Sequence, residues 1–351
     1  MGTPLRLSVL DQSPISAGAT AGDALNNSLD LARLADRLGY TRYWLAEHHG
    51  TPMLACVAPE VLIGPIVRET TRLRVGSGGI MLPHYSPLKV AETFSMLSAL
   101  APGRIDLGLG RAAGTDPTTS YALQRDRRQR SPDDFPQQLA ELLGQLDHSL
   151  PTEHPFSRLR PLQANTERPE PWLLGSSAQS GIWAAELGLP YAFADFINPG
   201  GDAIMNRYLA SYVAPAEAPA AAARGLVAVW VLCADTDAEA QRVAASARMA
   251  FTLFQRGELI AVPPIDTALE FLARPITDPF AATRQRRSIV GSPTTVVPQM
   301  RGVARAYGVD EVMVVTITYD HQARRRSYEL LAEAFGLAGA PQPGAVESAA
   351  K

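Results

Sequence analysis

Residues 73–109 read LRVGSGGIMLPHYSPLKVAETFSMLSALAPGRIDLGL, with a segment of helix length between two short apolar runs. The apolar runs at 73–77 and 105–109 predict strands, and residues 87–100 predict a helix. Ser86 and Pro87 mark the start of that helix, because they place a capping hydroxyl before a proline at the first helical position. A strand, a helix and a second strand in this order are typical of the βαβ unit of a parallel sheet.

The same alternation of short apolar runs and amphipathic segments continues along the chain. Eight predicted strands with helices between them span residues 5–336, which predicts an α/β fold of the (β/α)8 TIM-barrel type with insertions. A doubly wound parallel sheet is the alternative. The predicted strands are 5–10, 42–46, 73–77, 105–109, 172–174, 191–194, 226–232 and 312–316, and the predicted helices are 23–38, 59–70, 87–100, 136–146, 178–187, 202–212, 238–254, 294–307 and 322–335.

The barrel is expected to form a single domain over residues 1–337. Two stretches, 110–134 and 256–291, exceed ordinary loop length, and loops of this size are usually functional insertions or lids. Residues 338–351 are rich in alanine, glycine and proline and are expected to form a frayed tail.

The composition argues against several classes of partner and site. The net charge is −3 and the pI is about 6.1, so no global positive field attracts nucleic acid or an anionic membrane. No apolar stretch reaches the length of a membrane span or of a signal-peptide core. Cys56 and Cys233 match neither a disulfide framework nor a CxxC spacing, which predicts a reduced, cytoplasmic protein. The six histidines show no metal-ligand spacing, so no metal site is expected.

In a (β/α)8 barrel the active site lies where the strands end, so the residues after each predicted strand are the candidates. The first strand is followed by DQS at 11–13, and the second by Glu47, His48 and His49. Strand alternation is expected to aim His48 away from its two neighbours, and a histidine here can act as a general base near neutral pH. A pair of surface or supporting histidines is the alternative interpretation.

Two further strand ends carry groups that suit an anion. Residues 175–180 read GSSAQS, so the hydroxyls of Ser176, Ser177 and Ser180 and the N–H groups of a helix start lie together. This arrangement is typical of a phosphate site, although a simple capped helix is an equally good interpretation. Arg111, after the fourth strand, can hold a phosphate or stabilise developing negative charge, or can be a rim arginine in a salt bridge.

Glycines mark the end of the third strand. Gly78 and Gly79 leave the backbone without side chains, which suits either a flat ligand or tight packing. Residues 108–114 contain GxGxxxG in place of the dinucleotide motif GxGxxG, and turn residues follow where a helix should begin. We therefore reject a dinucleotide site there.

Taken together, the strand-end strings resemble the bacterial luciferase-like family of flavin-dependent monooxygenases. The strings are YWLAEHH at 43–49, GSGGIMLP at 76–83 and GRIDLGLGR at 103–111, and LDQSPI at 10–15 is similar to a single-chain branch of that family. The similarity continues from LGSS at 174–177 to GVDE at 308–311 and SYELL at 327–331, so it covers nearly the whole chain.

The resemblance implies an FMN site at the carboxyl mouth of the barrel. It places His48 beside the reactive face of the flavin, with Glu47 next to it, and a non-prolyl cis peptide at Gly78-Gly79 against the ring. It assigns contacts with the flavin phosphate to Arg111, Ser177 and Ser180. Ser176 replaces a glutamate of true luciferases, and Asp195 stands where they carry tryptophan, which argues against light emission.

The reaction implied by the resemblance uses reduced FMN (FMNH2) and O2, which form a flavin C4a-(hydro)peroxide that oxygenates a small organic substrate. A secondary metabolite such as a polyketide fits the GC-rich coding bias, because lysine occurs only at Lys89 and Lys351. Since no nicotinamide motif is present, a separate NAD(P)H-dependent flavin reductase is expected to supply reduced FMN. Residues 256–291 resemble a mobile lid, and relatives imply a homodimer formed by helices of the first half. An F420-dependent hydride-transfer oxidoreductase and a non-catalytic flavin-binding protein are the alternatives.

Overall fold

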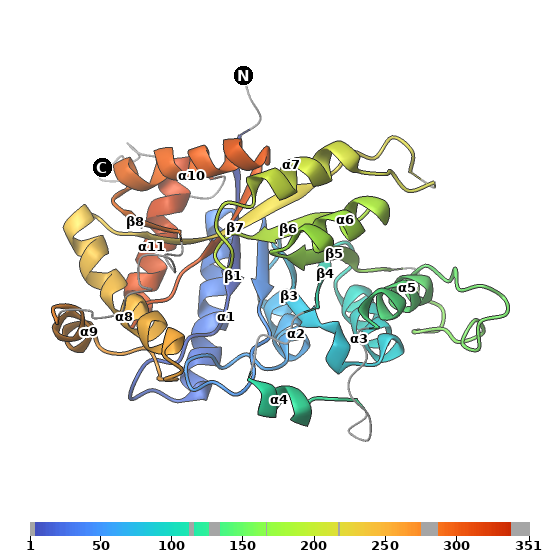
Figure 1. The fold of residues 1–351 in the computed structure, drawn as a ribbon, viewed down its shortest axis with the longest axis horizontal. Helices are drawn as coiled ribbons and strands as arrows, with labels where there is room; N and C mark the ends of the chain where they lie inside the picture. Colours follow the sequence, from blue (N-terminus) through green and yellow to red (C-terminus); the bar gives the residue numbers. More distant parts are fainter. Residues whose placement is uncertain are drawn as a thin grey trace, which may run out of the picture.

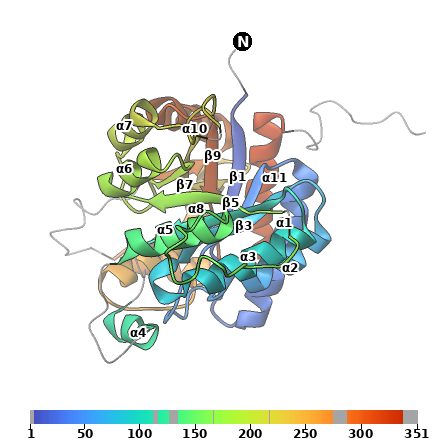
Figure 2. The same ribbon diagram turned by 90° about the vertical axis from the view of Figure 1, so that its right-hand side faces the viewer.

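The described part of the chain forms nine parallel strands in one sheet, and eight of them close into a barrel with helices outside (Figure 1). The computed structural model describes residues 4–111, 116–125, 134–165, 167–216, 218–274 and 287–337. Around the barrel the order is β1-β2-β3-β4-β5-β6-β7-β9, and the first and last strands pair side by side (Figure 2). The strands are β1 (Arg6–Asp11), β2 (Arg42–Leu45), β3 (Arg74–Met81), β4 (Ile105–Gly110), β5 (Glu170–Gly175), β6 (Tyr191–Ala194), β7 (Gly225–Cys233), β8 (Ser288–Gly291) and β9 (Glu311–Val315). The predicted TIM barrel is confirmed, because a doubly wound sheet would not close.

Each predicted helix is found within two residues of its expected bounds. The first begins at Ala21 because Thr20 and Asp23 form a capping box, and it ends at Gly39, whose φ of 86° is left-handed. The helices are α1 (Ala21–Leu38), α2 (Pro59–Glu69), α3 (Pro87–Leu100), α4 (Pro117–Ala122), α5 (Phe135–Leu146), α6 (Ala178–Glu186), α7 (Asp202–Ser211), α8 (Asp237–Gln255), α9 (Ile265–Leu272), α10 (Pro293–Tyr307) and α11 (His321–Phe335).

The starts of α3 and α10 have the predicted serine and proline but lack the predicted capping hydrogen bond. Ser86 and Ser292 precede these helices in extended conformation, with a proline at the first helical position as predicted. Within the described residues, however, neither serine makes a side-chain cap hydrogen bond. The Ser292 hydroxyl lies 3.0 Å from Thr294 Oγ1, so it is engaged with another side chain.

Four short elements in the described residues, η1 (Leu82–His84), α4, α9 and β8, are absent from the sequence-based prediction. Among the described strands β8 pairs with β7 alone, with Trp230 opposite Ser288 and Cys233 opposite Gly291, so it lies outside the closed barrel. It lies at the end of residues 256–291, which the sequence-based prediction assigned to an insertion. None of the described helices combines the length and apolar character needed to cross a membrane.

The two predicted insertions are partly described. Residues 256–274 lead into α9, and the Ala17 N–H donates to the Val262 carbonyl at 2.8 Å, which joins this segment to the loop after β1. Residues 112–115, 126–133 and 275–286 lie outside the described residues, as does the predicted tail at 338–351. The lid therefore stays a prediction.

A buried network of charges fills the amino-terminal half of the barrel interior. Arg42 donates to Asp106 at 2.7 Å and to Glu311 at 2.9 Å, and all three side chains are almost completely buried. Arg74 pairs with Asp106 at 2.6 Å, and the Trp44 indole N–H donates to the same carboxylate at 2.8 Å. Burial raises the pKa of Asp106 even though both arginines lower it. Five strand ends thus depend on one set of hydrogen-bonded ion pairs, in which Arg42 also contacts Glu170 on β5.

Replacing Asp106 with alanine tests this network. The change leaves Arg42 and Arg74 short of an anion in a buried site, and we expect the free energy of unfolding to fall by about 3–5 kcal/mol. Asp310→Ala is the matched control, because its ion pair with Arg6 is exposed and should contribute less than about 1 kcal/mol. Urea denaturation measures both; equal losses in the two variants would contradict the assigned role of the network.

Candidate active site

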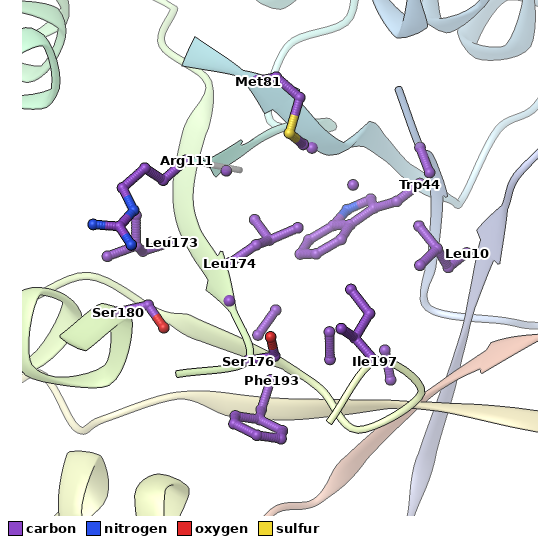
Figure 3. A pocket seen from close by; sticks show the side chains of 18 of the residues that line it. Leu10, Trp44, Met81, Arg111, Leu173, Leu174, Ser176, Ser180, Phe193 and Ile197 are labelled. Carbon is purple, nitrogen blue, oxygen red and sulfur yellow. The ribbon is translucent and has the colours of Figure 1, made fainter. Parts of the chain in front are cut away.

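A cavity of about 340 Å³ opens at the carboxyl ends of the barrel strands. Figure 3 shows Arg111 and Ser180 on one side of it and Trp44 and Leu10 on the other. The cavity is lined by all eight residues predicted for the site, which are Glu47, His48, Gly78, Gly79, Arg111, Ser176, Ser177 and Ser180. The fold thus brings the predicted residues together, whereas their individual roles stay predictions.

Glu47 connects the ends of β2 and β3. One carboxylate oxygen accepts from the Met81 N–H at 3.0 Å, and the other lies 2.8 Å from His49 Nε2. Both Glu47 and His48 line the cavity, so the expectation that strand alternation points them in opposite directions is wrong. The reason is that β2 ends at Leu45, so neither residue belongs to the strand. With both oxygens engaged, Glu47 is suited to positioning its neighbours.

His48 is the ionisable group of the cavity whose protonation is most altered by its surroundings. Burial lowers the pKa of His48 to about 4, a backbone interaction with Ala46 opposes this shift, and the charge of His49 adds to it. Its Nε2 lies 3.5 Å from Nε2 of the Gln12 amide. The imidazole is therefore neutral at neutral pH, and a neutral ring can both donate and accept a proton.

The end of β3 approaches its neighbours so closely that glycine is required. The peptide bond between Gly78 and Gly79 is cis, as the resemblance implied. A Cβ at Gly78 would lie 2.5 Å from Leu10 Cδ1, and one at Gly79 would lie 2.7 Å from the Gly108 carbonyl oxygen. The pairing register of β3 and β4 also shifts between Ser77 and Ile80. The two glycines thus satisfy the tight-packing interpretation and also present bare backbone to the cavity.

The polar corner of the cavity lies where β5 leads into α6. Ser177 precedes the helix without a side-chain cap hydrogen bond, and its Oγ lies 3.5 Å from Ser180 Oγ, which is 2.9 Å from the Tyr191 hydroxyl. A Cβ at Gly175 would lie 2.2 Å from Ser180 Oγ, so glycine admits that hydroxyl. Arg111 reaches this corner with its guanidinium 5.6 Å from the centre of the Trp183 ring. Hydroxyls, a helix start and a guanidinium together match the donors that bind a phosphate.

The remaining lining is apolar, and sequence reasoning missed it. Leu10, Trp44, Ala192, Ala228 and Met313 belong to strands and face the cavity. Strands of a parallel barrel are buried on both faces, so both faces are apolar and the sequence pattern does not separate inside from outside. Gln12, one of the strand-end residues 11–13, also lines the cavity, although the sequence assigned it no role.

Asp195 directly follows β6, and it does not belong to the residues that line the cavity. It is completely buried, and one of its oxygens accepts from the Tyr307 hydroxyl at 2.5 Å. Arg287, just before β8, lies 3.5 Å from the same oxygen. The residue that stands in place of a luciferase tryptophan therefore serves packing between β6, α10 and β8.

A family model described as luciferase-like monooxygenase matches residues 5–311. The chain belongs to the luciferase-like monooxygenase family. A luciferase-like monooxygenase of Escherichia coli (strain K12) is 40% identical over 331 residues, covering 93% of this chain and 96% of that protein. The N-acetyl-S-alkylcysteine monooxygenase of Bacillus subtilis (strain 168) is 35% identical over 331 residues, covering 94% of this chain and 98% of that protein. The crystal structure of apo-MsnO8 is 43% identical with a TM-score of 0.87, covering 95% of this chain and 98% of that one.

Membership in the luciferase-like monooxygenase family confirms the resemblance and makes the chain an enzyme. Among the described residues no group of three or more His, Cys, Asp or Glu side chains is arranged to hold a metal ion. The candidate chemistry of the cavity thus comes from a phosphate-binding corner, a neutral histidine and an apolar wall.

The neutrality of His48 can be tested by titration. Because its pKa is about 4 in the folded chain and 6.5 in an ordinary environment, the unfolded state binds more protons between these values. We expect the His48 ring to stay neutral from pH 8 down to about 5, and its burial to cost stability as the pH falls through this window. NMR of ring-labelled histidine, assigned with His48→Gln, measures the titration; a midpoint near 6.5 would refute the neutral assignment.

Proposed function

We propose that this chain is an FMNH2-dependent monooxygenase that uses O2 to oxygenate a small, uncharged organic substrate. The observation that carries the proposal is the division of one cavity into a phosphate-binding corner and a broad apolar wall. FMN combines one phosphate with a flat ring, and these two surfaces match its two ends. The monooxygenase names of the relatives from Escherichia coli and Bacillus subtilis support the oxygenation reaction.

The residues present fit the cofactor. Arg111, Ser177 and Ser180 offer a positive charge and two hydroxyls to the phosphate, and the bare backbone at Gly78 and Gly79 offers a flat surface to the ring. When bound, reduced FMN supplies the reaction with O2, which no amino-acid side chain can perform.

The protein groups prepare the surroundings of that chemistry. His48, neutral and at the cavity wall, can hold a proton on one ring nitrogen and accept one on the other. Glu47 keeps the β3 end and His49 in place through its two oxygens. Leu10, Trp44 and the rest of the apolar wall would exclude water from the reacting atoms, which limits side reactions with solvent.

The proposed reaction needs a source of reduced FMN and an organic substrate. A separate NAD(P)H-dependent flavin reductase supplies reduced FMN, and a cytoplasmic location gives access to reduced nicotinamide. The apolar wall favours a hydrophobic substrate, and a secondary metabolite such as a polyketide is one candidate. F420-dependent hydride transfer and flavin binding without turnover are the alternative functions, and the binding of F420 in the first experiment below tests the former.

The first experiment mixes the anaerobic protein and reduced FMN with oxygenated buffer and follows the absorbance of oxidised flavin. We expect reoxidation to be markedly slower than that of free reduced FMN, because the bound flavin is shielded from water. Reoxidation at the rate of free FMN, or tight binding of F420 in place of FMN, would overturn the monooxygenase proposal.

Arg111→Met tests the phosphate corner. Loss of a charge-assisted contact should weaken FMN binding about ten- to hundredfold while riboflavin, which lacks the phosphate, binds as before. Arg305→Met on the exposed face of α10 is the matched control and should change neither affinity. Fluorescence titration measures the dissociation constants; an equal loss for FMN and riboflavin would remove the phosphate role.

We also propose a homodimer formed through α2 and α3. These neighbouring helices expose large apolar side chains, with Val61 67%, Met96 55% and Leu100 67% exposed. A twofold axis would bring one such surface against its copy and bury these groups.

Val61→Asp and Leu100→Asp should each shift the mass measured by sedimentation from that of a dimer to that of a monomer. Val213→Asp is the control and should not, because Val213 is 57% exposed but lies outside α2 and α3. A wild-type monomer at micromolar concentration would refute the dimer.

A further inference from the structure

Gln12 is a buried polar residue in the wall of the cavity. It follows β1, it is 5% exposed, and it lines the same cavity as His48. Its amide nitrogen lies 3.5 Å from Nε2 of His48, whereas its Oε1 atom is buried and has no hydrogen-bond partner in the described part of the chain. Buried acceptors are nearly always satisfied in folded proteins, so an open one in a cavity wall indicates a ligand contact.

The orientation of the Gln12 amide assigns the donor and the acceptor in its contact with His48. An amide nitrogen can only donate, so Nε2 of His48 accepts, and the proton of the neutral ring resides on Nδ1. Nδ1 is also buried and makes no well-formed hydrogen bond with the described residues. The pair thus offers one acceptor, Gln12 Oε1, because the His48 ring already interacts with the backbone of Ala46.

The other polar groups near this part of the wall are already engaged. The Trp44 indole N–H donates to Asp106, and the Glu47 oxygens meet Met81 and His49. The cavity lining also includes the apolar residues Ala192, Ala194, Phe196, Ile197, Ala228 and Met313. A polar group of a molecule seated in this part of the cavity therefore finds its partner at Gln12.

We propose that Gln12 is a specificity-determining residue that selects an uncharged substrate carrying a hydrogen-bond donor, a hydroxyl or an amide N–H, which donates to Oε1. A charged group is disfavoured because the apolar lining would desolvate it without a counter-ion. This inference rests on the proposed function, since it names the class of molecule that the cavity oxygenates.

The test uses two isomers that differ only in the presence of a donor, octan-1-ol and heptyl methyl ether. Their binding to the full chain saturated with oxidised FMN is measured by isothermal titration calorimetry. We expect the wild type to bind the alcohol about five- to tenfold more tightly than the ether. Gln12→Leu should bind both isomers equally, by losing affinity for the alcohol and keeping it for the ether.

Two further variants keep the test decisive. Gln12→Glu retains an acceptor and should retain the preference for the alcohol, even if the leucine variant folds poorly. Gln145→Leu is the matched control, because Gln145 in α5 is equally buried with an unpartnered amide nitrogen but does not line the cavity, and it should keep the full preference.

Equal affinities in the wild type, binding of neither isomer, or a preference that survives in Gln12→Leu would overturn the proposal. The same titrations, repeated without FMN, test the role of Gln12 independently of the proposed function. If the protein does not bind FMN but still binds the alcohol more tightly than the ether, the flavin reaction is refuted and the role of Gln12 is supported.

Discussion

The ion pairs of Arg42 with Asp106 and Glu311 are the interaction on which the rest of the structure depends. A charged core is stable only if every charge is paired, so the strands that supply these side chains are held in one register. The network also reaches the cavity, because the indole of Trp44 donates to Asp106 while its ring lines the cavity floor. The polar half of the barrel thereby supports the geometry of the apolar half above it.

The two ends of the cavity differ in polarity. Its charge lies at one end, where Arg111 and the serines of the α6 start gather. At the other end the polar atoms are neutral, and His48 remains so because burial lowers its pKa. In such apolar surroundings each hydrogen bond is stronger, and each polar atom without a partner costs more free energy. A ligand that pairs with Gln12 Oε1 would remove this cost.

Residue type alone did not establish role. Glu47, predicted beside His48 as a catalytic group, lines the cavity with both oxygens engaged, so its catalytic role stays a prediction. Asp195, at the end of β6, is a packing residue bonded to Tyr307. For Asp195 these partners are residues distant in the chain, and no local pattern encodes such contacts.

The sequence by itself determined the barrel and the strand ends that form its mouth, because strand and helix periods, prolines and glycines act locally. It also placed His48, Arg111 and the serines among the candidates, since in a barrel the site follows the strands. The tertiary structure alone decided which polar atoms stay open to a ligand, and it left Gln12 Oε1 among them. It also decided which apolar side chains face inward, because strands buried on both faces carry no alternation to read. Both outcomes depend on register and closure of the barrel, which arise only when strands far apart in the chain pair.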